Sequence, residues 1–464
     1  MGLCVSVVTT LVQRLQEQQD SEVHLPGEPG YENRRRSLNL AVDPRPEVVV
    51  TPRRADQVPA IVRTAAEAGA PVAVQATGHG LATAYRDGVL LDVSKLSSVT
   101  VDPVRRTATV TGGTFWQPVV TAAAAHGLAP LSGTDPTVGV AGYTLGGGGG
   151  LLAGRYGLAA DMIRRVELVT ADGQARTVTA EREPDLFWAL RGGGGGFGVV
   201  TELEFDLVPV TRVYGGVSFF DGQRAAAILT AYQDLATRNL DDLTVTVRLV
   251  RTPPLPVLPD PIRGRPVVGM WVCGLGDPAR IQAELAPLLA AAGPPLLGGF
   301  TETDFTAVAA MLAEAGPPSR VPMMQQFLNL RRLSPATVDT LVGAIHAEDT
   351  NPVLMELRHW GGVLAQPSDL STGPARHGLA PFALMTLIPM LDPATVLEDQ
   401  QRLATLATRL APDQGGYNLL NFRPDPADAD QVFLPEVRRR LAEIKHRYDP
   451  QNLFRFTHRY PGAV

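Results

Sequence analysis

Apolar and polar positions alternate along the first two hundred residues in a way that divides them into short strands and short helices. Short apolar runs indicate buried strands, and apolar residues at helical spacing indicate amphipathic helices. The strands expected from this pattern cover residues 71–74, 89–93, 107–111, 166–170, 175–178 and 199–208. The expected helices cover residues 11–19, 56–68, 116–125 and 184–190. The first part of the chain is therefore predicted to mix short helices with short strands.

The pattern changes after Pro209, because the glycine clusters stop and the helices become longer. The expected helices cover residues 224–238, 277–291, 335–346 and 393–410, and the expected strands cover 242–250, 265–273, 352–360 and 382–389. A last helix is expected through residues 435–447. We therefore expect one domain at residues 1–210, a second at 211–414, and a segment at 415–464 that returns to the first domain.

The composition is that of a globular protein with small-molecule partners. The 464 residues carry a net charge of −6, and no basic stripe marks a surface for nucleic acid or an anionic membrane. Cys4 and Cys273 are too few for a disulfide framework or a structural zinc site, and no metal site is expected. Because no apolar run has the length of a signal peptide or a membrane span, we expect a cytoplasmic protein. The Ala, Gly and Pro content points to a bacterial source.

Two runs of five glycines, at residues 146–150 and 192–196, stand out in the sequence. A run without side chains lets the backbone pass very close to a neighbour with its N–H groups exposed, and a pyrophosphate is a common neighbour. A flexible linker is disfavoured, because both runs lie between expected strands and helices. No Gly-Lys-[Ser/Thr] follows residues 146–150, and the strand–turn–helix context of a dinucleotide fingerprint is missing.

His79 lies just after the expected strand 71–74, with Gly78 before it and Gly80 after it. An imidazole flanked by glycines can meet the edge of a planar ligand without clashes from neighbouring Cβ atoms. A lone histidine is more often structural than ligand-binding, so these residues alone leave both roles open.

Seven blocks follow one another in sequence order, at residues 74–80, 133–143, 146–150, 155–161, 185–192, 196–201 and 447–454. They include His79 and residues of both glycine runs. Together they resemble the FAD-linked oxidases of the vanillyl-alcohol oxidase superfamily, in particular the berberine bridge enzyme-like branch. The resemblance spans nearly the whole chain and implies an α+β fold. In that fold a two-part, PCMH-type FAD-binding domain, with its core at about residues 42–211, carries an inserted α/β substrate domain built on an antiparallel sheet.

The resemblance also implies FAD as the cofactor, bonded through its 8α-methyl group to His79. The other implied FAD contacts are Ala76, Thr77, Gly78, Gly80, Leu81, Gly133, Thr134, Thr137, Gly139, Gly142, Tyr143, Gly146, Gly147, Gly148, Gly198, Val199, Val200 and Asn421. Asp135 stands where many relatives carry a cysteine that makes a second flavin bond, so a single histidyl link and no cysteinyl link is expected. Tyr143 stands where relatives often carry a histidine, and Gln75 stands where they usually carry an arginine. One phosphate contact is therefore expected to come from the backbone alone.

The implied reaction moves a hydride from a C–H bond to flavin N5 while a base removes a proton from the substrate. Alternation over the strand 352–360 places Glu356, Arg358 and Trp360 on one face, opposite Met355, Leu357 and His359. In relatives this face meets the flavin ring. Glu356 is therefore a candidate base, Arg358 is expected to tune its pKa, and Trp360 is expected to pack on the substrate. A Glu–Arg pair on a solvated sheet is the alternative. Tyr417 and Tyr143 are the other catalytic candidates, and Arg248, Arg251 and His377 are weaker pocket candidates.

The leading hypothesis is an oxidase, monomeric or homodimeric, that acts on an alcohol or amine of a secondary metabolite or sugar and returns its electrons to O₂. Three alternatives stay open at this point. They are a dehydrogenase with another electron acceptor, an oxidative cyclase or tailoring enzyme of natural-product biosynthesis, and a flavin-bearing protein without turnover.

Overall fold

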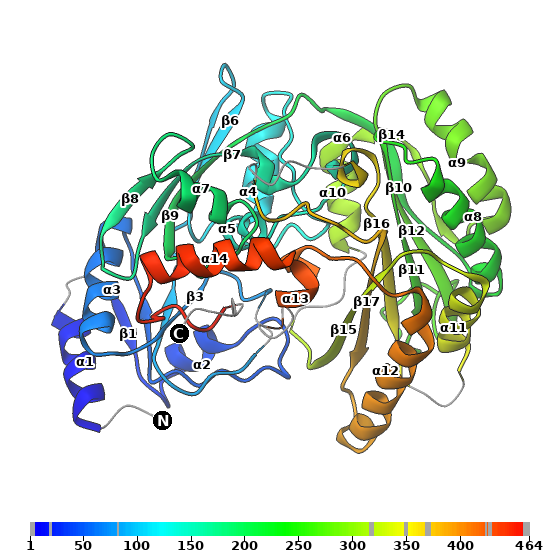
Figure 1. Cartoon of the computed structure of the whole chain (residues 1–464). Helices are drawn as coiled ribbons and strands as arrows, with labels where there is room; N and C mark the ends of the chain where they lie inside the picture. Colours follow the sequence, from blue (N-terminus) through cyan, green and yellow to red (C-terminus); the bar gives the residue numbers. More distant parts are fainter. Residues whose placement is uncertain are drawn as a thin grey trace.

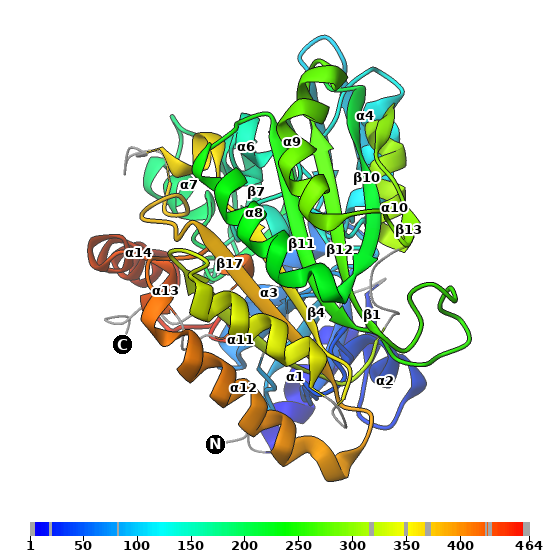
Figure 2. The same cartoon turned by 90° about the vertical axis from the view of Figure 1, so that its right-hand side faces the viewer.

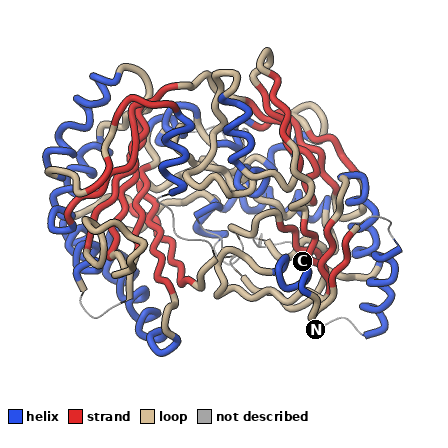
Figure 3. The backbone as a smooth tube through the Cα atoms, turned by 180° about the vertical axis from the view of Figure 1, so that it is seen from behind, coloured by secondary structure: helices blue, strands red, loops and turns tan. Residues whose placement is uncertain are grey.

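The computed structural model describes residues 5–17, 21–80, 83–314, 320–347, 351–366, 373–422, 425 and 429–457. Three sheets lie beside one another, the two smaller ones from residues 22–206 and the largest from residues 212–389 (Figures 1 and 3). Helices pack against all three sheets, so the expected α+β fold is confirmed. Within the described residues, no helix combines the length and apolar character needed to cross a membrane.

The four-stranded sheet contains the first glycine-flanked turn at its edge. Its strands run in the order β1 (Glu22–His24), β2 (Val48–Thr51), β4 (Val89–Asp92) and β3 (Val72–Gln75), and the last three are parallel. Helices α1 (Val5–Glu17) and α3 (Val58–Glu67) contribute apolar side chains to its core. Helix α1 begins earlier than the helix expected at 11–19, and residues 18–20 lie outside the described part. Strand β3 leads directly into residues 76–80.

The five-stranded sheet is antiparallel and forms a second core. Its order is β5 (Val99–Asp102), β6 (Thr107–Thr111), β9 (Val199–Asp206), β7 (Ile163–Val169) and β8 (Ala175–Val178). Leu203, Phe205 and Leu207 all face this core, as the alternation of that strand predicts. The core is covered by α4 (Trp116–Ala124), α5 (Val140–Leu145), α7 (Pro184–Leu190) and α14 (Pro435–Tyr448).

The eight-stranded antiparallel sheet is built from residues 212–389. Its order is β13 (Leu297–Gly298), β10 (Arg212–Asp221), β12 (Pro266–Gly274), β11 (Leu243–Arg251), β16 (Leu354–His359), β17 (Phe382–Pro389) and β15 (Met323–Leu330), with β14 (Thr301–Asp304) also paired to β10. One face is covered by α8 (Ala225–Thr237), α9 (Pro278–Ala292), α11 (Pro335–His346) and α12 (Val396–Leu410) (Figure 2).

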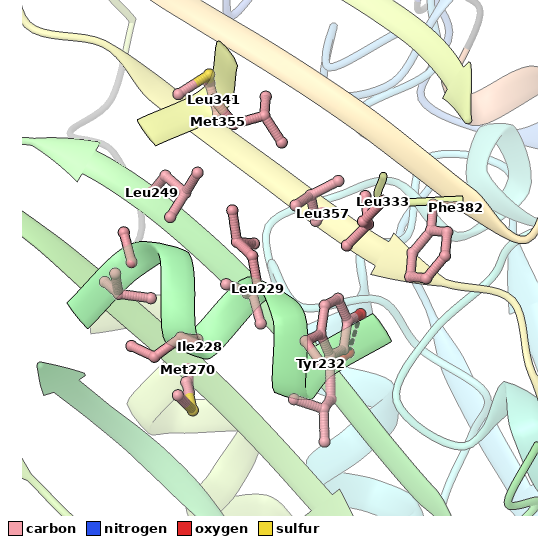
Figure 4. Close-up of a cluster of buried hydrophobic side chains, with 14 of the residues drawn as sticks. Ile228, Leu229, Tyr232, Leu249, Met270, Leu333, Leu341, Met355, Leu357 and Phe382 are labelled. Atoms are coloured by element: carbon pink, nitrogen blue, oxygen red, sulfur yellow. Dashed lines mark hydrogen bonds between the residues drawn. The ribbon is translucent and has the colours of Figure 1, made fainter. Parts of the chain in front are cut away.

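Strand β16 divides its side chains between the two faces of this sheet. Met355 and Leu357 are fully buried and pack with Leu229 of α8 in the core under the helices (Figure 4). Glu356 and Arg358 point to the opposite face. The alternation predicted from the sequence is therefore confirmed, and it directs the charged side chains of β16 toward the first half of the chain.

Several elements had no clear signal in the sequence. Strand β10 contains Gly215 and Gly216, which weaken strand propensity, yet both are required because a Cβ at either position would lie within 2.5 Å of a backbone oxygen. Strand β15 contains Gln325 and Gln326, which interrupt its apolar run. Helices α2 (Pro29–Arg35) and α10 (Phe305–Glu314) were likewise not expected.

The last segment of the chain joins the two smaller sheets through a buried ion pair. Lys445 of α14 donates to Asp449 Oδ2 at 2.6 Å and to the Gly196 carbonyl at 2.6 Å. Asp449 also accepts the N–H groups of Leu453 and Phe454, whose side chains belong to the core of the four-stranded sheet. Burial lowers the pKa of Lys445, and Asp449 opposes that shift. The pair therefore connects the second glycine run to both cores.

We expect Lys445→Met to lower the free energy of unfolding by about 3–5 kcal/mol, because it leaves the Asp449 carboxylate buried without its cation. Urea unfolding followed by tryptophan fluorescence measures this change. Arg439→Met is the control, because Arg439 lies on the same helix and its side chain is 77% exposed. Equal losses in the two variants would contradict a structural role for the buried pair.

Candidate active site

Two loops from different parts of the chain meet at the edge of the four-stranded sheet. Residues 76–80 follow β3, and residues 133–139 precede α5. The Gly139 N–H donates to Thr77 Oγ1 at 3.2 Å, and a Cβ at Gly139 would touch the Thr77 side chain at 3.4 Å. Two of the implied FAD-binding segments are thus in direct contact.

The imidazole of His79 lies between these loops, with a polar neighbour at each nitrogen. Thr77 Oγ1 is 2.9 Å from Nδ1, and Thr137 Oγ1 is 3.1 Å from Nε2. The Asp135 carboxylate lies 3.4 Å from Nε2. Burial alone would raise the pKa of Asp135, but hydrogen bonds from His79 and Thr137 outweigh it and lower the pKa to about 2. Asp135 is therefore ionised at neutral pH and faces the histidine.

Tyr143 of α5 lies behind the second loop, with its ring enclosed by glycines. Cβ atoms at Gly133, Gly148 or Gly150 would come within 3.0 Å of this ring or its hydroxyl. Its Oη is buried and forms no hydrogen bond with any described residue. Burial raises the pKa of Tyr143, so the hydroxyl is protonated and available as a donor.

The first glycine run passes between several packed groups of the protein. A Cβ at Gly150 would lie 2.0 Å from the Ser132 carbonyl oxygen, and one at Gly149 would lie 2.7 Å from the Trp360 ring. Asn421 braces the run, because its Oδ1 accepts the Gly148 N–H at 2.7 Å and its Nδ2 donates to the Tyr143 carbonyl at 3.1 Å. The side-chain amide of Asn421 thus binds backbone on both sides. Along most of the run, the glycines are required because other parts of the same chain pack directly against them.

A buried Arg–Glu–Arg cluster lies on the face of the large sheet turned toward these loops. Glu356 is 1% exposed and accepts from Arg248 Nε and Arg358 Nε, each at 2.5 Å. Burial alone would raise the pKa of Glu356, but the charges of Arg358 and Arg248 lower it to about 2. Arg248 stacks on Trp271 at 4.1 Å, and Arg358 lies over the ring of Phe422. The Glu–Arg pair is therefore buried rather than solvated.

Arg358 connects the large sheet to the second loop and the glycine run. It donates from Nη2 to Thr134 Oγ1 at 3.0 Å and from Nη1 to the Gly149 carbonyl at 3.4 Å. Trp360, at the end of the same strand, donates from Nε1 to Asn418 Oδ1 at 3.3 Å. The sheet, the loop 133–139 and the C-terminal part of the chain therefore meet at one point.

Tyr417 lies next to this meeting point on the segment that contains Asn418. Its backbone pairs with Leu379 and its ring packs on Gly378, while its hydroxyl forms no hydrogen bond with a described residue. Asn418 is buried and bonds to both Trp360 and Asn329 of β15. The sequence did not predict a role for Asn418, because nothing in the local pattern indicates that this asparagine is buried.

The remaining candidates lie at other places. His377 is buried and bonds to the Gly373 carbonyl, and Arg251 reaches the Ile345 carbonyl at the far end of β11. Gly198, Val199 and Val200 are buried at the start of β9, between the cores of the two smaller sheets. The pocket role expected for Arg251 is therefore not supported by its contact. Leu81 lies outside the described residues.

The residues around His79 fit a flat, phosphate-bearing cofactor such as FAD. Gly80 and Gly142 are exposed, and a Cβ at either would meet nothing within 4 Å. Ala76, Thr77 and Gly78 are half-buried and present backbone beside them. The Tyr143 hydroxyl has no partner among the described residues, and Arg358 reaches the second loop through Thr134. Open backbone, a buried donor and a cation are the groups that a flavin and its phosphates need.

Comparison with known proteins identifies the same regions. The model of the FAD binding domain family matches residues 46–179, and the model described as berberine and berberine like matches residues 430–459. The chain is 30% identical to (R)-6-hydroxynicotine oxidase of Paenarthrobacter nicotinovorans over 433 residues, which cover 90% of this chain and 91% of the relative. Glucooligosaccharide oxidase of Sarocladium strictum is 32% identical over 229 residues, 48% of this chain and 46% of the relative.

Solved structures agree with this result. The 6-hydroxy-D-nicotine oxidase from Arthrobacter nicotinovorans superposes with a TM-score of 0.83 at 26% identity, over 95% of this chain and 98% of that chain. The berberine bridge enzyme from Eschscholzia californica has the same fold, with a TM-score of 0.81 at 19% identity over 97% and 99% of the two chains.

The lowered pKa of Glu356 predicts how stability depends on pH. Its folded-state pKa of about 2 lies below the ordinary value of 4.5, so its stabilising contribution is complete above about pH 4.5 and is lost as the pH falls toward 2. We expect Glu356→Gln to remove this component, which makes the fall in unfolding free energy over that window shallower. Urea unfolding at a series of pH values measures it. Glu443→Gln is the exposed control, and a wild-type slope in Glu356→Gln would refute the assignment.

Proposed function

Because the chain belongs to the berberine bridge enzyme-like family of FAD-linked oxidoreductases, we propose that it is an oxidase whose FAD is bonded to His79 alone. One observation carries this proposal. The imidazole of His79 stands where the loops 76–80 and 133–139 meet, beside open backbone, and the residue facing it from the second loop is the carboxylate of Asp135. A carboxylate forms no thioether with a flavin, which supports a single link.

The proposed reaction oxidises an alcohol or an amine. FAD, when bound, supplies the hydride acceptor and passes the two electrons to O₂, which becomes hydrogen peroxide. The chain's own part is to hold the substrate C–H bond toward that acceptor and to take up the O–H or N–H proton. The names of two relatives, a hydroxynicotine oxidase and a glucooligosaccharide oxidase, support both substrate classes.

The lining of the large sheet favours a substrate with an apolar body. Met385 pairs with Glu356 across the strands, and Phe327 pairs with Met385, so both share the face of the Arg–Glu–Arg cluster. Both side chains are half-buried, unlike the residues packed under the helices. An apolar ring or chain beside a cation is the chemistry that this face would accept.

Within this proposal, Glu356 is a positioning residue, and the ionised phenolate form of Tyr417 is the catalytic base. A carboxylate with a pKa of about 2 is a weak proton acceptor at neutral pH, and its two oxygens are already occupied by Arg248 and Arg358. Tyr417 is half-buried, and its hydroxyl forms no hydrogen bond with the part of the chain that the structure describes. Its neighbour Asn418 is bonded to Trp360, which contacts the glycine run.

The single covalent link predicts a permanent yellow colour. We expect the purified protein to retain its colour after acid denaturation and precipitation, and its intact mass to exceed the sequence mass by one FAD. His79→Ala should lose both signals, because no other nucleophile at the loop junction replaces the imidazole. His126→Ala, an exposed histidine on the loop after α4, should keep them. A colourless wild-type pellet from a FAD-containing protein would reject the covalent link.

We expect Tyr417→Phe to slow substrate-driven flavin reduction by about 10²–10⁴-fold, the usual contribution of a general base. Its covalent flavin and thermal midpoint should stay unchanged. Stopped-flow absorbance and peroxide release, with the best substrate from a panel of alcohols, amines and oligosaccharides, measure this effect. Tyr214→Phe is the control, because Tyr214 is buried in the core under the helices. A wild-type rate in Tyr417→Phe would remove Tyr417 as base, and turnover with a quinone but without peroxide would indicate a dehydrogenase.

A further inference from the structure

We propose that Asp135 and Thr137 are positioning residues for the bond between His79 and the flavin. In this view they hold the imidazole proton on Nε2, so that Nδ1 presents its lone pair to the flavin 8α carbon. The inference rests on the proposed histidyl link and assigns a role to the residue that takes the place of a cysteine.

The groups that face Nε2 are both hydrogen-bond acceptors. Thr137 donates its hydroxyl hydrogen to Asp135 Oδ1 at 2.6 Å, and its backbone N–H donates to the same oxygen at 2.8 Å. The Thr137 oxygen has therefore given up its only hydrogen and can only accept from Nε2, 3.1 Å away. The second carboxylate oxygen, Oδ2 of Asp135, lies 3.4 Å from Nε2 and also only accepts. Nε2 must carry the hydrogen.

The group that faces Nδ1 is a hydroxyl that can donate to it. Thr77 Oγ1 already accepts the Gly139 N–H at 3.2 Å. Its own hydroxyl hydrogen is free to point at Nδ1, which lies 2.9 Å away. Because Nε2 carries the hydrogen, Nδ1 holds the lone pair and accepts from Thr77. The Thr77 hydroxyl must turn away before that lone pair can bond to carbon.

The bond-forming step balances with dioxygen as the oxidant. One C–H bond of the flavin 8α-methyl group breaks and one bond forms between that carbon and Nδ1. The methyl proton and the Nε2 proton are released, and the two electrons pass to O₂, which becomes hydrogen peroxide. Because the ring is cationic until Nε2 loses its proton, an ionised carboxylate beside Nε2 lowers the energy of that stage. Asp135 is partly exposed and can pass the proton to water.

Asp135→Asn tests this role with almost no change in shape. The backbone N–H of Thr137 keeps the amide oxygen in the place of Oδ1, so the amide NH₂ group faces Nε2 as a donor. That arrangement favours the other tautomer, with the proton on Nδ1. We expect covalent attachment of FAD to slow by about 10- to 100-fold, the range found when the carboxylate partner of a metal-bound histidine is removed.

The readout is the covalent fraction of full-length protein, by intact mass, over time after FAD is added to flavin-free protein. Non-covalent FAD binding, followed by flavin fluorescence, should stay within about threefold of wild type, because Asp135 contacts the histidine rather than the backbone that holds the phosphates. Asp102→Asn is the matched control. Asp102 caps a turn between β5 and β6 through the same kind of backbone bonds, far from His79.

A second variant separates chemistry from structure. In Asp135→Ala we expect added formate, a small carboxylate, to restore part of the attachment rate, which a purely structural defect would not allow. Attachment at the wild-type rate in both variants, with a covalent wild type, would overturn the role of Asp135. A wild type without covalent FAD would instead overturn the proposed function, so the two failures are distinguishable.

Discussion

The close approach of the glycine run 146–150 to its neighbours is the constraint on which the site depends. The Ser132 carbonyl, the Trp360 ring and the Asn421 amide each occupy space that a Cβ would need. Because the run has no side chains, the second loop, the end of β16 and the C-terminal part of the chain can meet on it. Any larger residue at Gly150 would collide with backbone, which moves only if the loop 133–139 moves with it.

Buried charge then determines the electrostatics of this junction. Glu356 between Arg248 and Arg358 leaves a net positive charge on the face of the large sheet. Burying such groups is costly unless every charge is paired and hydrogen-bonded, and here each Nε donates to one carboxylate oxygen. The same arrangement explains why Glu356 is better suited to hold guanidinium groups in place than to take a proton. Arg358 in turn connects the sheet to Thr134 and Gly149.

The loop junction around His79 uses polar contacts of another kind. Hydroxyls and one partly exposed carboxylate surround the imidazole, so its proton position follows from which neighbours can donate. A cysteine in place of Asp135 would remove that carboxylate. In the proposed function, the residue that limits the flavin to one bond therefore also supplies a partner for the histidine that forms it.

The sequence by itself determined the elements and their faces. The alternation that separates Met355 and Leu357 from Glu356 and Arg358 could be predicted, because a strand has a period of two whatever it packs against. The ordered blocks around His79 were enough to predict the family and its fold. Only the tertiary structure decided which groups meet: Arg248 lies 108 residues from Glu356, and Thr137 lies 58 residues from His79. Such contacts depend on how whole sheets and loops pack, and no local pattern in the chain records them.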